Sequence, residues 1–522
     1  MVFSTIMFLF RFLPITLALY YLAPPKLKNT VLFICSLVFY CWGEVRFFPV
    51  MLSLILLNYV CGLAIQHFDQ RPGLRRFFLI AALVGSLGML FYFKYANFVL
   101  ESANALLGTS FAPIQGIQVL PLGISFYTFQ TLSYSIDVYR RDVPAERNII
   151  DFGAYVVMFP QLIAGPIVKY RDVSNQLHVY KGRYCASQIE EGMTLFTFGL
   201  AKKVLLADAI GALWTDIIGI ADSPSTTFVG LANASTPLVW LGILAYSLQL
   251  YFDFSGYSMM GIGMGKMLGF DFPQNFNYPY ISASITEFWR RWHMTLSGWF
   301  REYVYIPLGG NRKGLKRQIL NLFIVELLTG IWHGANWNFI CWGLYYFVLL
   351  AVEKLFLLPY LKRGRIWPHL YTLFFVVVGW AMFVGNDPGV EFGLLFQRRC
   401  IAAVLPAQLR CAAGRVGGML HPADRKAVGQ AAQPHPDPGG HRPAAADRLH
   451  RLCGGQHQQP VPVFQLLIKE VSAGWINIPT PVSCADWAAT RCSQPLPCFL
   501  PPCLRWICLR RTALTARWKT PP

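Results

Sequence analysis

Residues 327–337 read LLTGIWHGANW, and they place one histidine, His333, inside a stretch that is otherwise uncharged and largely apolar from Leu327 to Val352. A charged side chain costs roughly 2.5–3.5 kcal/mol at the centre of a membrane helix, and an ionisable residue retained there usually faces a cavity or a partner. His333 is therefore a candidate functional residue. The alternative is that its ring is simply hydrogen-bonded to a neighbouring helix.

The composition predicts an all-α polytopic membrane protein. Hydrophobic residues make up 55% of the 522, charged residues only 14%, and the mean hydropathy is +0.41, whereas soluble proteins carry about 25% charged residues. Since about 20 apolar residues span a bilayer as a helix, we expect about ten transmembrane or re-entrant helices. They are expected near residues 5–22, 30–64 (two elements), 77–98, 117–138, 151–168, 194–220, 237–270 (two elements), 319–333, 336–358 and 368–385.

Two segments of this pattern carry additional expectations. The first span has no basic residues before its apolar run and no small-residue cleavage site before Pro24, so it is expected to be a retained membrane segment. Pro160 and the pair Gly165-Pro166 interrupt the span at 151–168, which favours a re-entrant element lining a cavity. Asp137 and Asp253 could line the same cavity or could pair between helices.

The net charge of +19 does not indicate nucleic-acid binding. The basic residues lie in short loops between predicted spans, including Arg71–Arg76, Arg140–Arg147 and Lys362–Arg365. Loops of this kind normally lie on the cytoplasmic side, next to anionic membrane lipids. The sequence thus favours contact with lipids and disfavours nucleic acid as a partner.

The chain changes character near Gln397. All 24 tyrosines and 38 of the 40 phenylalanines lie at or before this residue, while eight of the 13 cysteines and 16 of the 34 prolines follow it. We predict a membrane domain at residues 1–397 that is incomplete at its C-terminal end, followed by an aberrant Pro/Arg/Cys-rich tail at 398–522. A disordered tail would fit the Pro and Gly content. A shifted reading frame is favoured, because the pattern of spans stops abruptly, and it would leave the activity of this chain in doubt.

A cytoplasmic amphipathic helix is expected near residues 284–303. It begins with Ser284-Ile285-Thr286-Glu287, the spacing of a capping box. At 100° per residue, basic side chains gather near Glu287, while aromatic side chains and His293 gather on the other side. Such a helix lies along the membrane interface, and its tryptophans, with Trp332 and Trp337, are expected to be interfacial anchors.

His293 and His333 are the candidate site residues. Burial disfavours a charged imidazole, so a buried histidine stays a neutral base that can take a proton from a hydroxyl. The alternative for His293 is a residue at the edge of an amphipathic helix without a chemical role. The loop Leu308-Gly309-Gly310-Asn311-Arg312 reads as a tight turn, and its two glycines are weak evidence of phosphate binding.

Several motifs together resemble the membrane-bound O-acyltransferase family, and within it the membrane subunit of bacterial alginate O-acetylation. The resemblance covers residues 1–397 in family order. The matching segments are PYISASITEFWRRWH at 279–293, REYVYIPLGGNR at 301–312, WHGAN at 332–336, FYFKYANF at 91–98, LPLGISFYTF at 120–129, FPQLIAGP at 159–166 and YFDFSGYS at 251–258. One departure is Met259, which follows Ser258 where the family text has an acidic residue.

The resemblance implies a bowl of tilted helices around a tunnel, with His333 as the catalytic histidine and His293 as a second, supporting one. We expect an acetyltransferase of the bacterial inner (cytoplasmic) membrane, in which His333 is the general base. Acetyl-CoA is the expected donor substrate, with Arg290, Arg291 and Arg312 attracting its phosphates. No bound cofactor and no metal site are expected.

The expected acceptor is an exported polysaccharide such as alginate, and the expected partners are a periplasmic acetyltransferase and the polysaccharide export machinery. Two other functions stay open. A D-alanyl transferase acting on teichoic acid would share the fold and the histidines. A transporter or channel would use His333 in a proton path, and it predicts paired intramembrane acids and an inverted repeat, which the sequence does not show.

Overall fold

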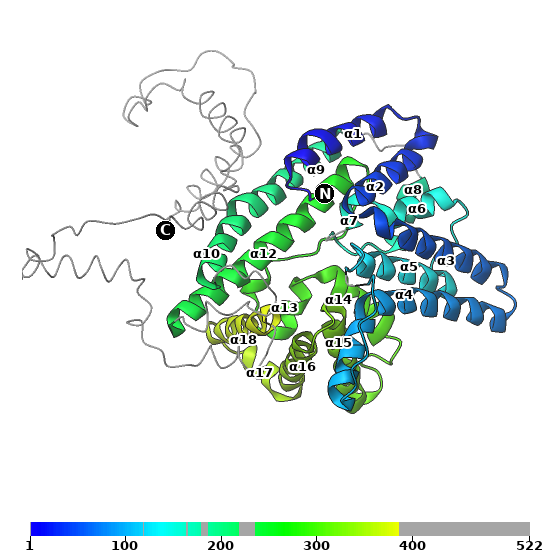
Figure 1. The fold of residues 1–522 in the computed structure, drawn as a ribbon. Helices are drawn as coiled ribbons and strands as arrows, with labels where there is room; N and C mark the ends of the chain where they lie inside the picture. The colour runs from blue at the N-terminus through cyan, green and yellow to red at the C-terminus, as the bar shows by residue number, and fades with distance from the viewer. Residues whose placement is uncertain (1, 118, 163–164, 179–185, 219–234, 386–522) are drawn as a thin grey trace, which may run out of the picture. The chain divides into compact units, whose positions relative to one another are not determined.

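The computed structural model describes residues 2–117, 119–162, 165–178, 186–218 and 235–385. Within these ranges the chain forms helices joined by turns and loops, without a β-strand (Figure 1). The expected all-α fold is therefore confirmed for this part. The domain limit predicted at residue 397 and the predicted tail at 398–522 lie outside the described residues.

The first group of helices runs to residue 178. Its elements are η1 (Phe8–Phe12), α1 (Leu13–Leu22), η2 (Pro25–Leu27), α2 (Lys28–Glu44), η3 (Val45–Phe47), α3 (Phe48–His67), α4 (Pro72–Leu107), α5 (Ile124–Arg140), α6 (Ile149–Val157), α7 (Phe159–Leu162) and α8 (Tyr170–His178). The predicted division of 30–64 into two elements is confirmed, since the backbone leaves the helical region at Glu44 (φ −156°, ψ 86°).

The second group contains both candidate histidines. Its elements are α9 (Ala186–Ala201), η4 (Lys202–Ala207), α10 (Asp208–Ile218), α12 (Thr236–Met267), η6 (Pro279–Ile281), α13 (Ile285–Arg291), α14 (Met294–Phe300), η7 (Arg301–Tyr305), α15 (Gly314–His333), α16 (Trp337–Val352), η8 (Glu353–Leu357), α17 (Leu358–Leu361) and α18 (Trp367–Val384).

Five helical stretches of the described residues are long and apolar enough to cross a membrane. They are Pro25–His67, Pro72–Leu107, Thr236–Met267, Trp337–Leu361 and Trp367–Val384, and a shorter apolar helix covers Phe8–Leu22. The protein is thus a multi-pass membrane protein, as expected. The larger count of about ten spans and the enclosed tunnel stay predictions.

The prediction of two elements at 237–270 is wrong, because α12 is one helix of 32 residues. The glycines of α12 lie inside the helix without ending it. They allow the backbone of α12 to approach other helices closely. A Cβ added to Gly256 would lie 2.7 Å from the carbonyl oxygen of Gly199, and one added to Gly263 would lie 2.5 Å from that of Gly192. Small residues permit this close approach between membrane helices.

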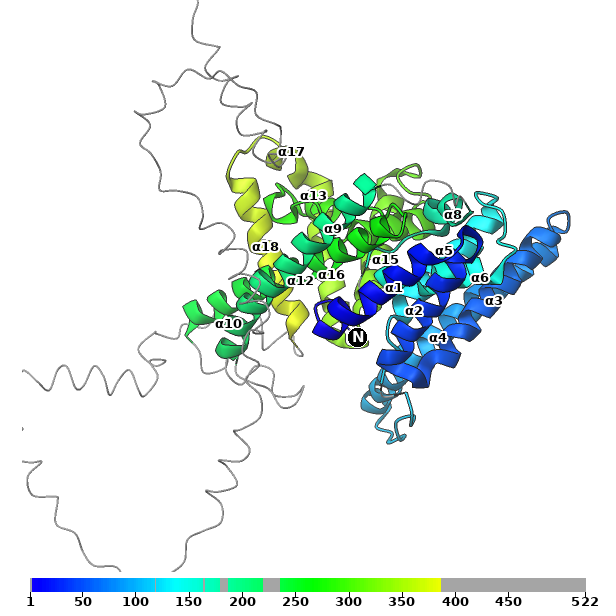
Figure 2. The ribbon, with the colours of Figure 1, turned by 90° about the horizontal axis from the view of Figure 1, so that it is seen from above.

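We call these four residues the glycine seam of α9 and α12: Gly192, Gly199, Gly256 and Gly263. In each helix the two glycines are seven residues apart, and Gly192 meets Gly263 while Gly199 meets Gly256, so the helices run antiparallel. Figures 1 and 2 both show α9 and α12 side by side along their length. The seam therefore fixes how these two helices pack.

The expected span at 151–168 is broken in the described residues, as its prolines and glycine indicate. The backbone leaves the helix at Met158 (φ −50°, ψ 112°) between α6 and α7. Freed backbone groups find side-chain partners: Ser36 Oγ accepts from Phe159 N–H at 3.2 Å, and Gln161 donates to the Tyr155 carbonyl. Non-helical backbone inside a membrane protein needs hydrogen-bond partners from the protein, and these two side chains provide them. A re-entrant path stays a prediction.

The continuous amphipathic helix expected at 284–303 is wrong in one respect, because the helix breaks between α13 and α14. The backbone is extended at Trp292 and left-handed at His293 (φ +43°, ψ 53°). A single helical wheel therefore cannot describe both halves. The capping box is confirmed in outline, since Ser284 Oγ accepts from Glu287 N–H at 3.0 Å and the Glu287 carboxylate accepts from Ala283 N–H at 3.0 Å.

Candidate active site

His333 is the last residue of α15, at the tight hairpin between α15 and α16. The two helices touch through glycines: a Cβ on Gly330 would lie 2.4 Å from the Phe339 carbonyl oxygen, and one on Gly343 would lie 2.5 Å from the Glu326 carbonyl oxygen. A Cβ on Gly334 would lie 2.2 Å from the Phe339 ring. The small residues that follow and precede His333 therefore let the hairpin close.

Aromatic rings surround the His333 imidazole. The ring centroids of Trp342 and Phe383 lie 4.9 Å and 5.1 Å from it, both edge to face, and that of Phe339 lies 6.5 Å away. α18 supplies Phe383 and α16 supplies the other two. The imidazole is half-buried and makes no hydrogen bond within the described part of the chain. No helix among the described residues hydrogen-bonds the ring, and the role of His333 stays a prediction.

The end of α15 is held by two residues of α4. Lys94 Nζ donates to the Trp332 carbonyl and lies 3.4 Å from Ser125 Oγ, and the Tyr95 hydroxyl donates to the Ile331 carbonyl at 2.8 Å. These carbonyls belong to the last turn of a helix, where they lack partners within the helix and where a positive charge is favourable. Lys94 and Tyr95 thus fix the turn that carries His333.

His293 is 2% exposed and lies at the break between α13 and α14. Its ring Nδ1 is 3.0 Å from Asn275 Oδ1, and Nε2 is buried without a hydrogen-bond partner among the described residues. Burial lowers the pKa of the His293 imidazole to about 3, so the ring is neutral at pH 7. Its predicted position on the interior side is confirmed.

The structure brings the two histidines to one aromatic residue, Trp332. The His293 ring centroid is 6.0 Å from that of Trp332, and the His333 centroid is 4.8 Å from it. The predicted anchoring role of several tryptophans is wrong, because Trp292, Trp299 and Trp332 are buried in the protein. Trp337 is 57% exposed, as an anchor would be.

Of the three arginines predicted to attract the donor's phosphates, only Arg291 has side-chain partners within the described residues. Arg291 donates from Nε and Nη2 to Glu287 Oε1 at 2.8 Å each, and from Nη1 to the Asn277 carbonyl at 3.2 Å. The side chains of Arg290 and Arg312 are exposed and make no hydrogen bond or ion pair within the described part. The predicted tight turn at 308–312 is confirmed, with positive φ at Gly309 and Gly310.

Sequence reasoning missed three residues that build this site: Lys94, Asn275 and Glu353. The Glu353 carboxylate accepts from Ile285 N–H at 2.6 Å and from Thr286 N–H at 2.9 Å, and so caps the first turn of α13. Asn275 fixes His293 from a loop 18 residues earlier. Only Lys94 carried a signal, as a charge within the apolar run FYFKYANF.

The two aspartates with open interpretations, Asp137 and Asp253, both pair between helices. Asp137 is fully buried, and both of its carboxylate oxygens lie 2.9 Å from the Tyr303 hydroxyl. Asp253 Oδ1 lies 3.0 Å from Lys203 Nζ of η4. The interpretation as interhelical partners is therefore confirmed for both.

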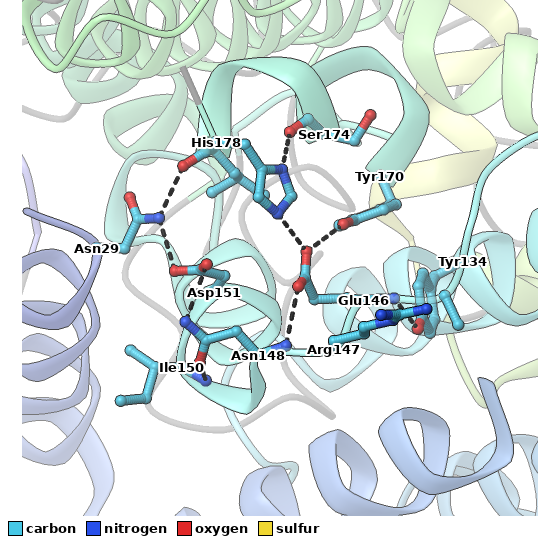
Figure 3. A network of polar contacts seen from close by, with 12 residues as sticks. Asn29, Tyr134, Glu146, Arg147, Asn148, Ile150, Asp151, Tyr170, Ser174 and His178 are labelled. Carbon is cyan, nitrogen blue, oxygen red and sulfur yellow. Dashed lines mark hydrogen bonds and ion pairs between the residues drawn. The ribbon is translucent and has the colours of Figure 1, made fainter. Parts of the chain in front are cut away.

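A separate polar network joins α8 to α6 and to the loop that precedes α6 (Figure 3). Glu146 accepts from the Tyr170 hydroxyl at 2.6 Å and lies 3.0 Å from His178 Nε2, while Asp151 accepts from Asn29 at 2.7 Å. Carboxylate and imidazole atoms of Glu146, Asp151 and His178 lie within 4.8 Å of one another. Hydrogen bonds occupy these carboxylates, and the expectation of no metal stays a prediction.

Comparison with known proteins places this site in a family. The model of the membrane-bound O-acyltransferase family matches residues 83–387, which include both histidines. The chain is 46% identical to the probable alginate O-acetylase AlgI of Pseudomonas putida over 403 residues, covering 76% of this chain and 80% of that protein. Over 393 residues it is 46% identical to the probable alginate O-acetylase AlgI of Pseudomonas aeruginosa, covering 73% and 72%.

A third relative is named for a different polymer. The chain is 35% identical to the peptidoglycan O-acetyltransferase of Helicobacter pylori over 419 residues, covering 73% of this chain and 77% of that protein. These relatives share O-acetyl transfer and differ in the polymer that is named. The family match over more than half of the chain, together with these identities, shows that the protein is a multi-pass O-acyltransferase that belongs to the membrane-bound O-acyltransferase family.

Proposed function

We propose that the protein transfers an acetyl group from a cytoplasmic thioester, with acetyl-CoA as the donor substrate, for the O-acetylation of an exported polysaccharide such as alginate. The observation that carries this proposal is the pair of histidines that both contact Trp332, in a chain aligned with alginate O-acetylases. The inner membrane is the proposed location, with the basic loops on the cytoplasmic side.

In the proposed reaction, His333 is the general base. Its unprotonated ring nitrogen takes the proton of the acceptor hydroxyl as the hydroxyl oxygen attacks the thioester carbonyl carbon. The carbon–sulfur bond breaks, and the leaving thiolate takes the proton from the His333 imidazolium, so atoms and charge balance. Base catalysis of this kind typically contributes about 10²–10⁴-fold. The aromatic rings that pack against the half-buried His333 leave it less exposed to water, which favours transfer over hydrolysis.

His293 assists this step by positioning the reactants or relaying a proton, as a neutral buried imidazole can. Arg290 and Arg312 are the arginines available for the donor's phosphates, since they are exposed and unpaired among the described residues. Arg291 is committed to Glu287 and Asn277, and we propose for it a structural role in α13.

The test is polysaccharide O-acetylation in cells that express the full chain in place of the host's own enzyme. His333→Ala is expected to lower polymer-bound acetate by about 10²-fold or more, with the protein still present in the membrane fraction. His67→Gln is the matched control, because His67 is an exposed histidine at the end of α3. Undiminished acetylation by His333→Ala at equal membrane abundance would overturn the proposal.

The same cells separate the alternatives. Ester-linked D-alanine in place of acetate would favour a D-alanyl transferase. A proton path through His333 predicts that His333→Glu, which remains titratable, keeps part of the function, whereas a general base at this position predicts loss. Cross-linking in intact cells followed by purification of the chain tests the proposed periplasmic acetyltransferase partner and the export machinery.

We propose that the segment 398–522 is read in a shifted frame. The composition changes at Gln397, and the match to the family model ends shortly before it, at residue 387. Sequencing of the gene across the codons for Phe392 to Arg415 tests this. An apolar helix restored in another frame is the expected result, and an intact frame would overturn the proposal.

A further inference from the structure

Asn275 reaches the site from the loop that follows α12, and its side chain is 1% exposed. We propose that Asn275 is a positioning residue: it holds His293 in the tautomer with hydrogen on Nδ1, so that Nε2 accepts a hydrogen bond from an O–H or N–H of the bound reactant. This inference rests on the proposed function, since it gives His293 a defined task in the same site. Both the tautomer and its use can be measured.

The tautomer of His293 follows from the hydrogen-bond partners of one atom, Asn275 Oδ1. Asn275 Oδ1 lies 3.3 Å from the backbone nitrogen of Thr295, a group that can only donate, so this end of the amide is the carbonyl oxygen. The same oxygen accepts from Thr295 Oγ1 at 2.9 Å. Since His293 Nδ1 lies 3.0 Å from an oxygen that can only accept, Nδ1 must carry the hydrogen. A neutral imidazole then has a bare lone pair on Nε2.

Backbone contacts hold this arrangement in place. Met294 N–H donates to the Asn275 carbonyl at 2.9 Å, and Asn277 N–H donates to the Arg291 carbonyl at 2.9 Å. These two bonds stop α13 and hold His293 in its left-handed conformation. Thr295 Oγ1 also accepts from Ile167 N–H at 3.0 Å, which ties the junction to the segment after α7. The imidazole therefore has little freedom to turn over.

His293 Nε2 is buried and lacks a donor within the described part of the chain. The rings of Phe254, Phe276 and Trp332 lie 4.8, 6.4 and 6.0 Å from the His293 ring. The neighbouring titratable groups are His333 and Lys94, which both contact Trp332. Trp332 Nε1 is buried and unpaired as well. A bare acceptor costs free energy unless a ligand supplies a donor. A hydroxyl can donate to His293 Nε2 and accept from an indole N–H.

Two reactants could supply the group: the acceptor polysaccharide through a hydroxyl, and the thioester donor through an amide N–H. Either group would donate a hydrogen bond to the unprotonated Nε2 of a neutral imidazole. Either hydrogen bond would be lost if the ring changed tautomer. Asn275→Leu removes the oxygen and frees the ring to place its hydrogen on Nε2. Asn275→Asp keeps an acceptor for Nδ1–H but adds a buried negative charge that favours the doubly protonated ring.

The first experiment reads the tautomer directly. The full chain, labelled with nitrogen-15 in its histidine rings, is studied by NMR in lipid bilayers, and His293→Gln identifies the His293 signals. We expect protonated Nδ1 and unprotonated Nε2 in the unaltered protein at neutral pH. Asn275→Leu is expected to populate the Nε2–H form, and Asn275→Asp the imidazolium. A protonated Nε2 in the unaltered protein, or no change in Asn275→Leu, would overturn the inference.

The second experiment measures transfer in membrane vesicles that contain the full chain, with acetyl-CoA as donor and de-O-acetylated alginate as acceptor. Asn275→Leu is expected to lower the rate about 10–100-fold, the size of effect seen when the residue that orients a metal-bound histidine is removed. Asn275→Asp is expected to recover with rising pH as the imidazolium loses its proton. A raised KM for alginate alone would assign the donor group to the polysaccharide, and a raised KM for acetyl-CoA alone to the thioester donor.

Thr295→Val is the matched control. It removes two hydrogen bonds from the same junction but keeps the Asn275–His293 contact, so a purely structural role of Asn275 predicts equal loss in both variants. We expect Thr295→Val to keep the tautomer and most of the rate. If His333→Ala stays active while the NMR signals behave as expected, the proposed function fails and the tautomer stands. The reverse pattern defeats only the inference about Asn275.

Discussion

The Tyr303 hydroxyl donates to the carboxylate of Asp137, with both carboxylate oxygens at 2.9 Å, and so joins η7 to α5 across 166 residues of sequence. Asp137 is fully buried, and a buried carboxylate that loses its donor keeps the whole cost of leaving water. This contact therefore stabilises the segment that follows His293 against the first group of helices.

Tyr303→Phe removes only the hydroxyl and is expected to lower the free energy of unfolding by about 1–3 kcal/mol. Thermal unfolding in detergent measures the change. Tyr305→Phe is the control, because the Tyr305 hydroxyl contacts Asn311 on an exposed turn and its loss is expected to change stability by less than about 0.5 kcal/mol. Equal melting temperatures for the two variants would contradict a stabilising role of the Asp137 contact.

The glycine seam predicts a second stability effect. Gly199→Ala places a Cβ 2.6 Å from the backbone oxygen of Gly256, so α9 and α12 must move apart, and overpacking of this kind costs about 1–3 kcal/mol. Gly88→Ala is the control, since a Cβ there meets nothing within 4 Å and alanine favours a helix. We expect a lower melting temperature only for Gly199→Ala, and the same loss in both variants would argue against the seam.

Glu302 gives the stability a pH dependence. Burial alone would raise the pKa of its carboxyl, but ion pairs with Lys169, 2.8 Å away, and with Arg171 hold that pKa below its usual range. A depressed pKa in the folded state contributes stability that is fully present above the unfolded value of about 4.3 and is lost as the pH falls through the folded value. Glu302 therefore contributes at neutral pH and progressively less below about pH 4.

Glu302→Gln removes this contribution at every pH. We expect the variant to melt below the unaltered protein at pH 7 and the two curves to converge on acidification. Asp271→Asn serves as a control, since Asp271 is an exposed partner of Lys266. A constant difference in melting temperature between pH 7 and pH 3 would mean that the ion pairs of Glu302 are not its source.

Lys94 is expected to affect activity through the position of His333. Lys94→Met leaves the Trp332 carbonyl without its donor and loosens the turn that ends at His333, and misplacement of a reacting group by 1 Å can cost about 100-fold in rate. Polymer-bound acetate at equal membrane abundance is the measurement. Lys26→Met, at an exposed lysine, should leave acetylation unchanged. Full activity of Lys94→Met would show that the last turn of α15 keeps His333 in position without the Lys94 hydrogen bond.

The sequence singled out the two histidines of the candidate site but not the residues that hold them in place. His333 stood out because an imidazole in an apolar run is costly, and His293 because its helix has two distinct sides. Asn275 could not be recognised, since an asparagine in a polar loop is common and its role depends on the loop lying against residues 291–295. Lys94 was visible only as a charge, because nothing in the local pattern shows that α4 reaches the end of α15.

The errors have a common physical origin in tertiary contacts. Periodicity predicted one helix through His293, but two backbone hydrogen bonds to the loop at 275–277 break it there. Length predicted two elements at 237–270, but α12 stays whole because its glycines pack against α9. Trp292 and Trp299 resembled anchors, and the folded chain buries both. Each outcome was decided by a segment distant in sequence.

The left-handed backbone at His293 offers an opening for chemical complementation. Glycine adopts a positive φ without strain, so His293→Gly removes the imidazole and suits the backbone it leaves behind. The resulting hole would have the size of an imidazole and would retain Asn275 Oδ1 at one end as an anchor for an N–H. Free imidazole supplied in solution could then occupy it, which would make the contribution of this one ring titratable by concentration in an otherwise intact enzyme.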